Sequence, residues 1–503
     1  MVIEDQRILA IGRKEDLEPL TDGDTIAVDL QGRTIMPGLN DTHIHIWKVG
    51  NLLTYMLDLR GASSLEDMQQ RILDYHRRYP ELAWIVARGF NEAGWSDNRL
   101  PDKNDLDKIV PGKPVYVIRT CAHIAVANTA ALQHSGIVAT TLVPEGGVMH
   151  LGSDGRPNGI FSETALGLVA NHIPAYSSEQ LKTMVKAARN EMLRYGITAA
   201  TDPAVDPLLM EAYLEMDHSG ELGFRLNAIP ILLPDGGAKP YPIPDLFASP
   251  FLKVNTVKFF SDGGLSGKTA ALKRHYKDSL EKGVLRLEPS NYYRLCQLAL
   301  EKGLGIATHA IGDAAIEFVI KAYTSFYKDF PGSIRRIEHL GLPEKQHLHD
   351  MATTGISTSM QAIFISELGK NFIRYLDADY LSRCYPVRSV LDHGILIALS
   401  SDAPVVNNFN PFKGVYAAVS RKDDQGNIIA GPEAISIKEA LKLYTSNAAA
   451  ISGVSDFGSL QEGMLADFIE VEKNPLVTAV DDLPNLKVVN TWVNGAIAYS
   501  ANG

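Results

Sequence analysis

Apolar residues recur along most of this chain in two alternating patterns. Residues 64–78, 178–195 and 288–302 carry them at the spacing of helices with one buried face. Between these stretches lie short runs rich in valine, isoleucine and phenylalanine, bounded by glycine or proline, which is typical of buried strands. Strands that alternate with helices over this length predict an α/β fold built on a parallel sheet.

After residue 36 the pattern predicts a series of strands whose sheet could close into a barrel. They lie at His43, Gly196, Leu226, Val254, Gly305, Ile334, Gly355 and Ile395. Eight parallel strands joined by helices form a (β/α)8 TIM-like barrel. Residues 61–158 hold further strands at 84–89 and 114–119 and are too long for one strand–helix unit. We therefore expect an insertion after the first barrel strand that covers the barrel mouth.

Both ends of the chain are predicted to contribute to one small β-domain. Residues 2–12 have the pattern of a hairpin and 25–30 that of a short strand, but such strands cannot form a domain alone. Residues 466–471 and 488–495 are again short strands, with Asn-Gly at a turn. The predicted division is a β-sandwich domain of 1–36 and 455–503, a metal-dependent barrel of 37–60 and 159–454, and an insertion of 61–158.

Composition narrows the class of protein. The 503 residues are 45% hydrophobic and 21% charged, as in ordinary soluble globular proteins with a large core. A net charge of -11, without a dense lysine or arginine tract, argues against a nucleic-acid partner. The 3 cysteines are scattered, which fits a reducing compartment. No apolar run reaches the ~18 residues of a membrane span and no signal-peptide profile is present, so we expect a cytoplasmic protein without membrane association.

Candidate chemistry begins at His43 and His45, which follow an apolar approach and a Pro-Gly turn. On a strand, residues two apart point to the same face, so both imidazoles could bind one metal ion. A chance pair is the alternative, and His347 and His349 illustrate it. They have the same spacing but lie in a helical stretch, where side chains two apart are separated by about 200° around the axis.

Four further reactive residues fall at the ends of predicted strands, where TIM barrels hold their active sites. Lys258 lies in an apolar run, His309 and His339 each end a strand, and Asp402 follows the last one. Singly, each has a simpler explanation: a lysine that extends to solvent, an ordinary core or surface histidine, or a turn. Together they lie on different strands in barrel order, a joint pattern that is hard to obtain by chance.

This set of side chains suits metal-assisted hydrolysis. Neutral imidazoles favour a borderline divalent ion, of which zinc is the expected one. A metal lowers the pKa of its bound water to about 7. Asp402 could accept the proton of that water during attack on a carbonyl or amidine carbon and then pass it to the leaving group.

These segments resemble the amidohydrolase superfamily, and most closely its family-3, YtcJ-like metal-dependent hydrolases, which include N-substituted formamide deformylases. The matching segments are 36–45, 119–123, 154–159 with Glu163, 257–263, 309–315, 336–339, 385–389, 401–405 and 458–468. The resemblance implies that His43 and His45 bind one metal and that Asp402 is both ligand and proton shuttle. It also implies that a carboxylated Lys258 bridges to a second metal held by His309 and His339. A one-metal site with unmodified Lys258 paired to Asp402 is the alternative.

Four residues are candidates for substrate contact: His123, Arg119, Trp95 and Gln361. For the first three, packing inside the insertion is the alternative. Residues 362–366 are apolar where relatives tend to carry a proline and a polar segment, which predicts a more apolar pocket. Relatives usually carry an extra N-terminal strand pair before the stretch that starts here at Val2, so we expect the β-domain to be short of one element.

The main reading is a hydrolase of an amide or formamide bond in a small organic molecule. Deamination of a cyclic amidine is the rival reaction, and a barrel that binds a ligand without turnover is the rival outside enzymes. A homodimer is only a family-level expectation.

Overall fold

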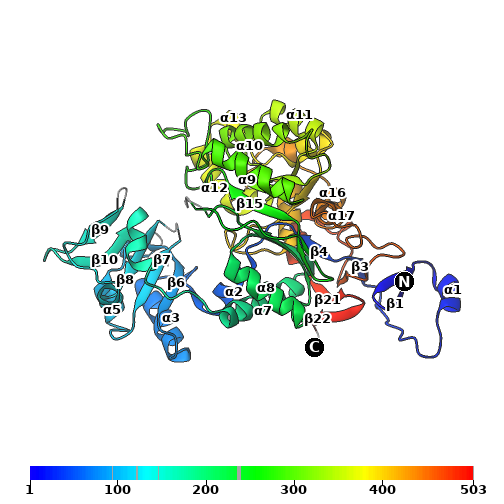
Figure 1. The fold of residues 1–503 in the computed structure, drawn as a ribbon. Helices are drawn as coiled ribbons and strands as arrows, with labels where there is room; N and C mark the ends of the chain where they lie inside the picture. The colour runs from blue at the N-terminus through cyan, green and yellow to red at the C-terminus, as the bar shows by residue number, and fades with distance from the viewer. Residues whose placement is uncertain (93–94, 121–122, 145–146, 235–238, 502–503) are drawn as a thin grey trace. The chain divides into compact units, whose positions relative to one another are not determined.

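The computed structural model describes residues 1–92, 95–120, 123–144, 147–234 and 239–501 (Figure 1). Contacts divide the chain into two compact units: Met1–Ile46 with Ala188–Gly503, and Trp47–Ala187. In the described residues, no helix combines the length and the apolar character needed to cross a bilayer.

Among the described residues, the larger unit holds two five-stranded sheets. One has the order β13 (Phe247–Ala248), β14 (Leu252–Val254), β12 (Arg225–Pro230), β11 (Ile197–Val205), β4 (Leu39–Asp41). The other has the order β15 (Thr256–Phe260), β16 (Gly305–Ala310), β17 (Arg335–His339), β18 (Ser357–Met360), β19 (Ile397–Leu399). All neighbours are parallel except β13 and β14. The α/β fold with parallel sheets predicted from the hydrophobic pattern is confirmed.

Backbone hydrogen bonds link these two sheets in two places. Beyond β12, the amide of Leu232 donates to the carbonyl of Lys258 at 3.1 Å. Beyond β4 and β19, the amide of Asp402 donates to the carbonyl of His43 at 2.7 Å, and that of His45 to the carbonyl of Ala403 at 2.9 Å. These bonds bring the C-terminal ends of β4 and β19 together, which matters for the site described below.

Helices follow the strands of the larger unit, and their ends carry ordinary capping signals. They are α8 (Pro207–His218), α9 (Pro289–Glu301), α10 (Asp313–Ser325), α11 (Lys345–Thr354), α12 (Ile363–Tyr375), α13 (Ala378–Ser382), α14 (Val387–Asp392), α15 (Pro411–Ser420), α16 (Ile437–Leu443) and α17 (Ser446–Ile451). The carboxylate of Glu288 accepts the amides of Ser290 and Asn291 at the start of α9. α11 ends at Gly355, whose φ of 67° is left-handed. Because His347 and His349 lie in α11, the expectation that this second His-x-His is helical is confirmed.

The two ends of the chain share an antiparallel sheet of order β22 (Ala496–Ser500), β21 (Val488–Val493), β20 (Phe468–Val471), β3 (Thr34–Pro37). The hairpin predicted near the N-terminus forms from β1 (Val2–Glu4) and β2 (Arg7–Ala10). It is followed by α1 (Lys14–Leu17) and a short 3-10 turn, η1 (Glu18–Leu20). The strand predicted at 25–30 was wrong: these residues form no strand, and Ile26 and Val28 are exposed.

The smaller unit has its own sheet and core. Its strand order is β5 (Met56–Asp58), β6 (Ile85–Phe90), β7 (Val115–Arg119), β8 (Ile124–Ala127), β10 (Pro157–Ser162), β9 (Val148–Leu151). Its helices include α2 (Ile46–Leu53), α3 (Leu65–Arg78), α4 (Lys103–Asp107), α5 (Thr129–His134), η3 (Glu163–Leu166) and α6 (Gly167–Ala170). α7 (Ser178–Arg194) runs from this unit into the larger one. The strands predicted at 84–89 and 114–119 correspond to β6 and β7.

Candidate metal centre

Two histidines that follow β4 converge on Asp402, which follows β19. Nε2 of His43 lies 3.4 Å from Oδ1 of Asp402, and Nε2 of His45 lies 3.3 Å from the same oxygen. All three side chains are buried. The backbone bonds between β4 and β19 hold both segments in this register.

His339 and His309 complete the cluster from the ends of β17 and β16. The ring centroid of His339 lies 4.7 Å from that of His43 and 4.4 Å from that of His309. Ligand atoms of His43, His339 and Asp402 all lie within 4.8 Å of one another, close enough to share a metal ion. Nε2 of His309 lies 3.3 Å from a carboxylate oxygen of Asp262 and 3.2 Å from the carbonyl of Gly263.

The protonation states favour metal binding. Burial lowers the pKa of His43, and lowers that of His339 well below its usual value, so both imidazoles are neutral and can donate a lone pair. Burial would raise the pKa of Asp402, but the hydrogen bond from His45 and the neighbouring imidazoles outweigh it and lower that pKa. The site therefore offers neutral nitrogens beside a carboxylate.

Lys258 lies in β15 with its side chain fully buried. Within the described residues its Nζ has no hydrogen-bond partner, and it lies 4.9 Å from the ring centroid of Phe260. Burial lowers the pKa of Lys258 to about 8, although the charge of Glu338 works in the opposite direction. Burying a charged ammonium at this place costs free energy. A larger fraction of Lys258 is therefore in the neutral amine form than for an exposed lysine.

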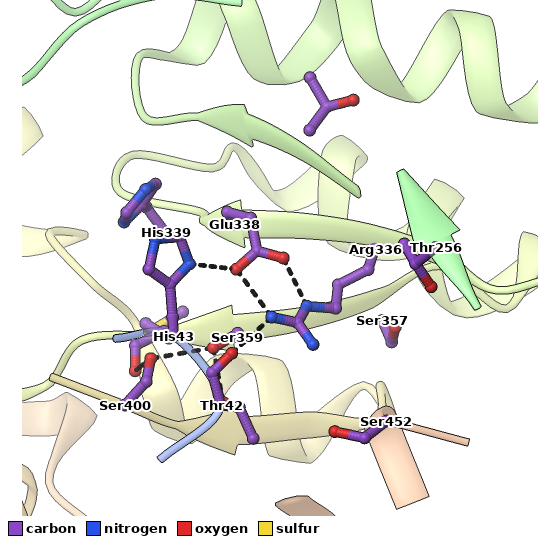
Figure 2. Close-up of polar contacts among 12 residues, drawn as sticks. Thr42, His43, Thr256, Arg336, Glu338, His339, Ser357, Ser359, Ser400 and Ser452 are labelled. Carbon is purple, nitrogen blue, oxygen red and sulfur yellow. Dashed lines mark hydrogen bonds and ion pairs between the residues drawn. The ribbon is translucent and has the colours of Figure 1, made fainter. Parts of the chain in front are cut away.

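A buried ion pair that the sequence reasoning missed supports His43 (Figure 2). Oε2 of Glu338 lies 2.5 Å from Nδ1 of His43. Arg336 donates from Nη2 to that same oxygen at 3.0 Å, and to the carbonyl of Thr42 at 2.6 Å. Burial would raise the pKa of Glu338, but the charge of Arg336 and the hydrogen bond with His43 hold it below its usual range. The one signal in the sequence was the alternation of charged residues in an otherwise buried strand.

A family model described as the amidohydrolase family matches residues 27–499 of this chain. The chain belongs to the amidohydrolase family. It is 29% identical over 508 residues to the putative amidohydrolase YtcJ of Bacillus subtilis, covering 99% of this chain and 95% of that protein. It is 26% identical over 524 residues to the N-substituted formamide deformylase of Arthrobacter pascens, covering 100% of this chain and 95% of that protein.

A solved structure is similar over nearly the same length. It is an uncharacterized metal-dependent hydrolase from Pyrococcus horikoshii, with a TM-score of 0.80 and 26% identity, covering 95% of this chain and 94% of that one. These relationships make this amidohydrolase a metal-dependent hydrolase that acts on carbon–nitrogen bonds.

Gln361 of this amidohydrolase follows β18 and contacts the metal centre directly. Its Oε1 lies 2.6 Å from Nδ1 of His339, and its Nε2 donates to Oγ of Ser400 at 2.9 Å. A carbonyl oxygen accepts, so Nδ1 of His339 carries the proton and Nε2 keeps its lone pair. The contact with substrate that the sequence predicts for Gln361 remains a prediction. In the structure its side chain forms hydrogen bonds with His339 and Ser400.

The other three residues expected to contact substrate lie in the smaller unit. Arg119 donates from Nε to Glu92 at 2.8 Å. Nδ1 of His123 lies 2.9 Å from a carboxylate oxygen of Glu163, with both side chains about half exposed. The neighbouring residues 93–94, and residues 121–122 of the matching segment 119–123, lie outside the described residues.

Trp95 is 5% exposed and donates from its indole to the carbonyl of Ala62 at 2.9 Å. It packs with Phe90 at 6.0 Å between ring centroids, in the smaller unit's own core. The structure therefore brings the six predicted metal-site residues into one unit, and places His123, Arg119 and Trp95 in the other.

Proposed function

We propose that this amidohydrolase cleaves the carbon–nitrogen bond of an amide or formamide in a small organic substrate. The observation that carries the proposal is the approach of Nε2 of His43 and of His45 to one oxygen of Asp402, at 3.4 and 3.3 Å. Imidazole nitrogens with a carboxylate are a ligand set that zinc-type ions prefer. The formamide class is supported by the deformylase of Arthrobacter pascens, whose sequence aligns with the whole chain.

One divalent ion, for which zinc is the expected identity, would be held by His43, His45 and Asp402. A second would be held by His309 and His339, with Lys258 carboxylated to bridge the two. The buried Nζ of Lys258, which has no partner among the described residues, supports this role. Its lowered pKa favours the neutral amine, the form that reacts with carbon dioxide. A single ion beside unmodified Lys258 is the alternative.

In this mechanism Asp402 moves the proton. A bound divalent ion supplies Lewis-acid activation of a water molecule and of the substrate carbonyl. The carboxylate of Asp402, kept ionised by His45 and His43, accepts the water's proton and then delivers it to the departing nitrogen. Glu338 and Gln361 hold His43 and His339 with Nε2 turned toward the site.

We also infer that the parallel strands of the larger unit form one (β/α)8 barrel. The bonds from Leu232 to Lys258 and from Asp402 to His43, which join the two parallel sheets in two places, support this closure. The sheet shared by β3 and β20–β22 supports a β-domain built from both ends of the chain. The boundaries of 1–36 with 455–503, 37–60 with 159–454, and 61–158 remain predictions, as do a cytoplasmic location and a homodimer.

Metal content tests the site. The purified protein, measured by inductively coupled plasma mass spectrometry, is compared with His43→Ala, Lys258→Ala and His349→Ala. The last is a matched control, because exposed His349 has the same His-x-His spacing but lies in α11. About two metals per chain, falling in the first two variants only, would support the bridged site. One metal that survives Lys258→Ala would support a single ion, and no metal even after zinc supplementation would overturn the proposal.

The reaction is tested with a panel of small N-substituted formamides, simple amides and cyclic amidines. Release of formate or carboxylate with an amine, abolished in Asp402→Asn, is the expected result. Release of ammonia from an amidine, with no turnover of amides, would replace this function with deamination. Carbon NMR after reconstitution with isotope-labelled bicarbonate tests carboxylation of Lys258 independently of activity.

A further inference from the structure

A cavity lies in the larger unit, toward the N-terminal ends of the parallel strands. Its volume is about 520 Å³, within the range of about 300–1,000 Å³ that small-molecule sites occupy. It is lined by β4, β11, β12, β14 and residues 452–457. Ser452, one of the lining residues, lies well apart from His43 and His339 in Figure 2. The metal centre lies at the C-terminal strand ends, so the two sites are separate.

Two carboxamides in the lining of this cavity each have a buried oxygen without a protein partner among the described residues. Asn40 is 3% exposed and Asn227 is 7% exposed. In the described residues, Oδ1 of each is buried without a hydrogen bond. Buried polar groups are nearly always bonded, because an unpaired one loses its hydration without compensation.

The strand register places these two carboxamides on one face. On β11, Ala199 pairs with Asn40 and Thr201 pairs with Asn227. Residues two apart on a strand point the same way, so Asn40 and Asn227 project from the same side of neighbouring strands. Oγ1 of Thr201, between them, is also buried without a partner among the described residues.

The cations in the lining are already engaged, which argues against an anionic ligand. Arg225 donates to the carboxylate of Asp467 at 2.5 and 2.9 Å and to the carbonyl of Pro250 at 2.8 Å. Nζ of Lys253 donates to the carbonyl of Gly453 at 2.6 Å. Arg7, a third cation of the lining, donates to the carbonyl of Gly463 at 2.8 Å and lies 4.0 Å from the carboxylate of Asp456. The buried oxygens left to recognise a ligand belong to the neutral carboxamides of Asn40 and Asn227.

We propose that this cavity binds a small neutral molecule with an amide or urea group, recognised by Asn40 and Asn227. A carboxamide both donates and accepts hydrogen bonds, so it pairs with the complementary atoms of another amide. This second binding site goes beyond the proposed hydrolysis and does not depend on it.

Calorimetric titration of the purified full chain with acetamide and with N-methylurea tests the proposal. We expect saturable binding that weakens at least tenfold in Asn40→Leu and Asn227→Leu and stays within twofold in Arg7→Gln, a matched lining control. Ala248→Trp, at an exposed position on the cavity rim, blocks the site without touching the carboxamides and should also abolish binding. The Ala248→Trp variant therefore still tests binding at this cavity if a leucine variant fails to fold.

Three results would overturn the proposal. The first is binding lost in His43→Ala but kept in Asn227→Leu, which assigns it to the metal centre. The second is tighter binding of acetate than of acetamide, weakened by Arg7→Gln, which indicates an anion site. The third is no saturable binding of either probe to the wild-type protein.

Discussion

Oε2 of Glu338 lies 2.5 Å from Nδ1 of His43, and this contact decides which nitrogen of His43 faces Asp402. A histidine bonded through Nδ1 presents Nε2, the atom that lies 3.4 Å from Oδ1 of Asp402. Arg336 holds the same carboxylate from the other side. Two charged residues of β17 thus orient a histidine that follows β4.

Glu338→Gln should weaken metal binding about 10- to 100-fold, because the amide is a poorer acceptor for Nδ1 of His43. It also leaves Arg336 buried without a counter-charge, which should lower the free energy of unfolding by about 3–5 kcal/mol. Chelator competition measures the affinity and thermal denaturation the stability. Exposed Glu472→Gln is the control, and unchanged affinity in a folded Glu338→Gln protein would contradict the orienting role.

Gln361→Leu should lower metal affinity about tenfold, because His339 loses the acceptor for its Nδ1 proton. Gln361→Glu keeps an acceptor in the same place and should restore most of the affinity. Metal titration with steady-state kinetics separates two roles for this residue. A raised KM with unchanged metal affinity would instead favour the substrate contact expected from the sequence.

The sequence was informative about the metal-site candidates because each one ends or follows a strand with a clear hydrophobic signature. His309 ends a run that became β16, and Asp402 follows β19. Parallel strands gather their C-terminal ends at one edge, so strand-end residues could be grouped without knowing the pairing.

The supporting residues could not be found in the same way. Arg336 and Glu338 alternate along β17, a spacing that is usual for a solvent-facing strand. Only the packed structure shows that this face is fully buried and that Glu338 contacts His43. The strand expected at 25–30 failed for a related reason, since a strand needs a neighbour to pair with and local alternation does not reveal whether one is present.

Gly312→Ala should disturb His309 through Asp262. A Cβ at Gly312 would lie 2.0 Å from the carbonyl oxygen of Ala271, whereas one at Gly264 meets nothing within 4 Å. The amide of Gly312 donates to Asp262 at 2.8 Å, and Asp262 lies 3.3 Å from Nε2 of His309. Overpacking of this kind costs about 1–3 kcal/mol, so Gly312→Ala should lower both stability and metal content.

The matched control for this change is Gly264→Ala, measured in the same denaturation and metal assays. Equal behaviour of Gly312→Ala and Gly264→Ala would show that the loop around Asp262 adapts without affecting His309.

Glu317 of α10 should make stability depend on pH in the acid range. Its Oε2 lies 2.5 Å from Nζ of Lys273, which also contacts Glu344 at 2.8 Å. Hydrogen bonds from Lys273 and Lys321 lower the pKa of Glu317 from 4.5 to about 2. The folded protein therefore holds this group ionised where the unfolded chain would protonate it, so the stabilisation is present above pH 4.5 and is lost as the pH falls toward 2.

Because the Glu317 side chain is 32% exposed, solvent screening reduces the effect, and Glu317→Gln should lower the free energy of unfolding by about 1 kcal/mol at neutral pH. The difference from wild type should shrink steadily below pH 4.5, since protonation removes the ion pair from the wild-type protein as well. Thermal denaturation of wild type and Glu317→Gln at neutral and at acid pH measures this difference in stability. Glu462→Gln, at an exposed position, is the control. A difference that persists undiminished in acid would mean that Glu317 stabilises α10 through packing and not through its charge.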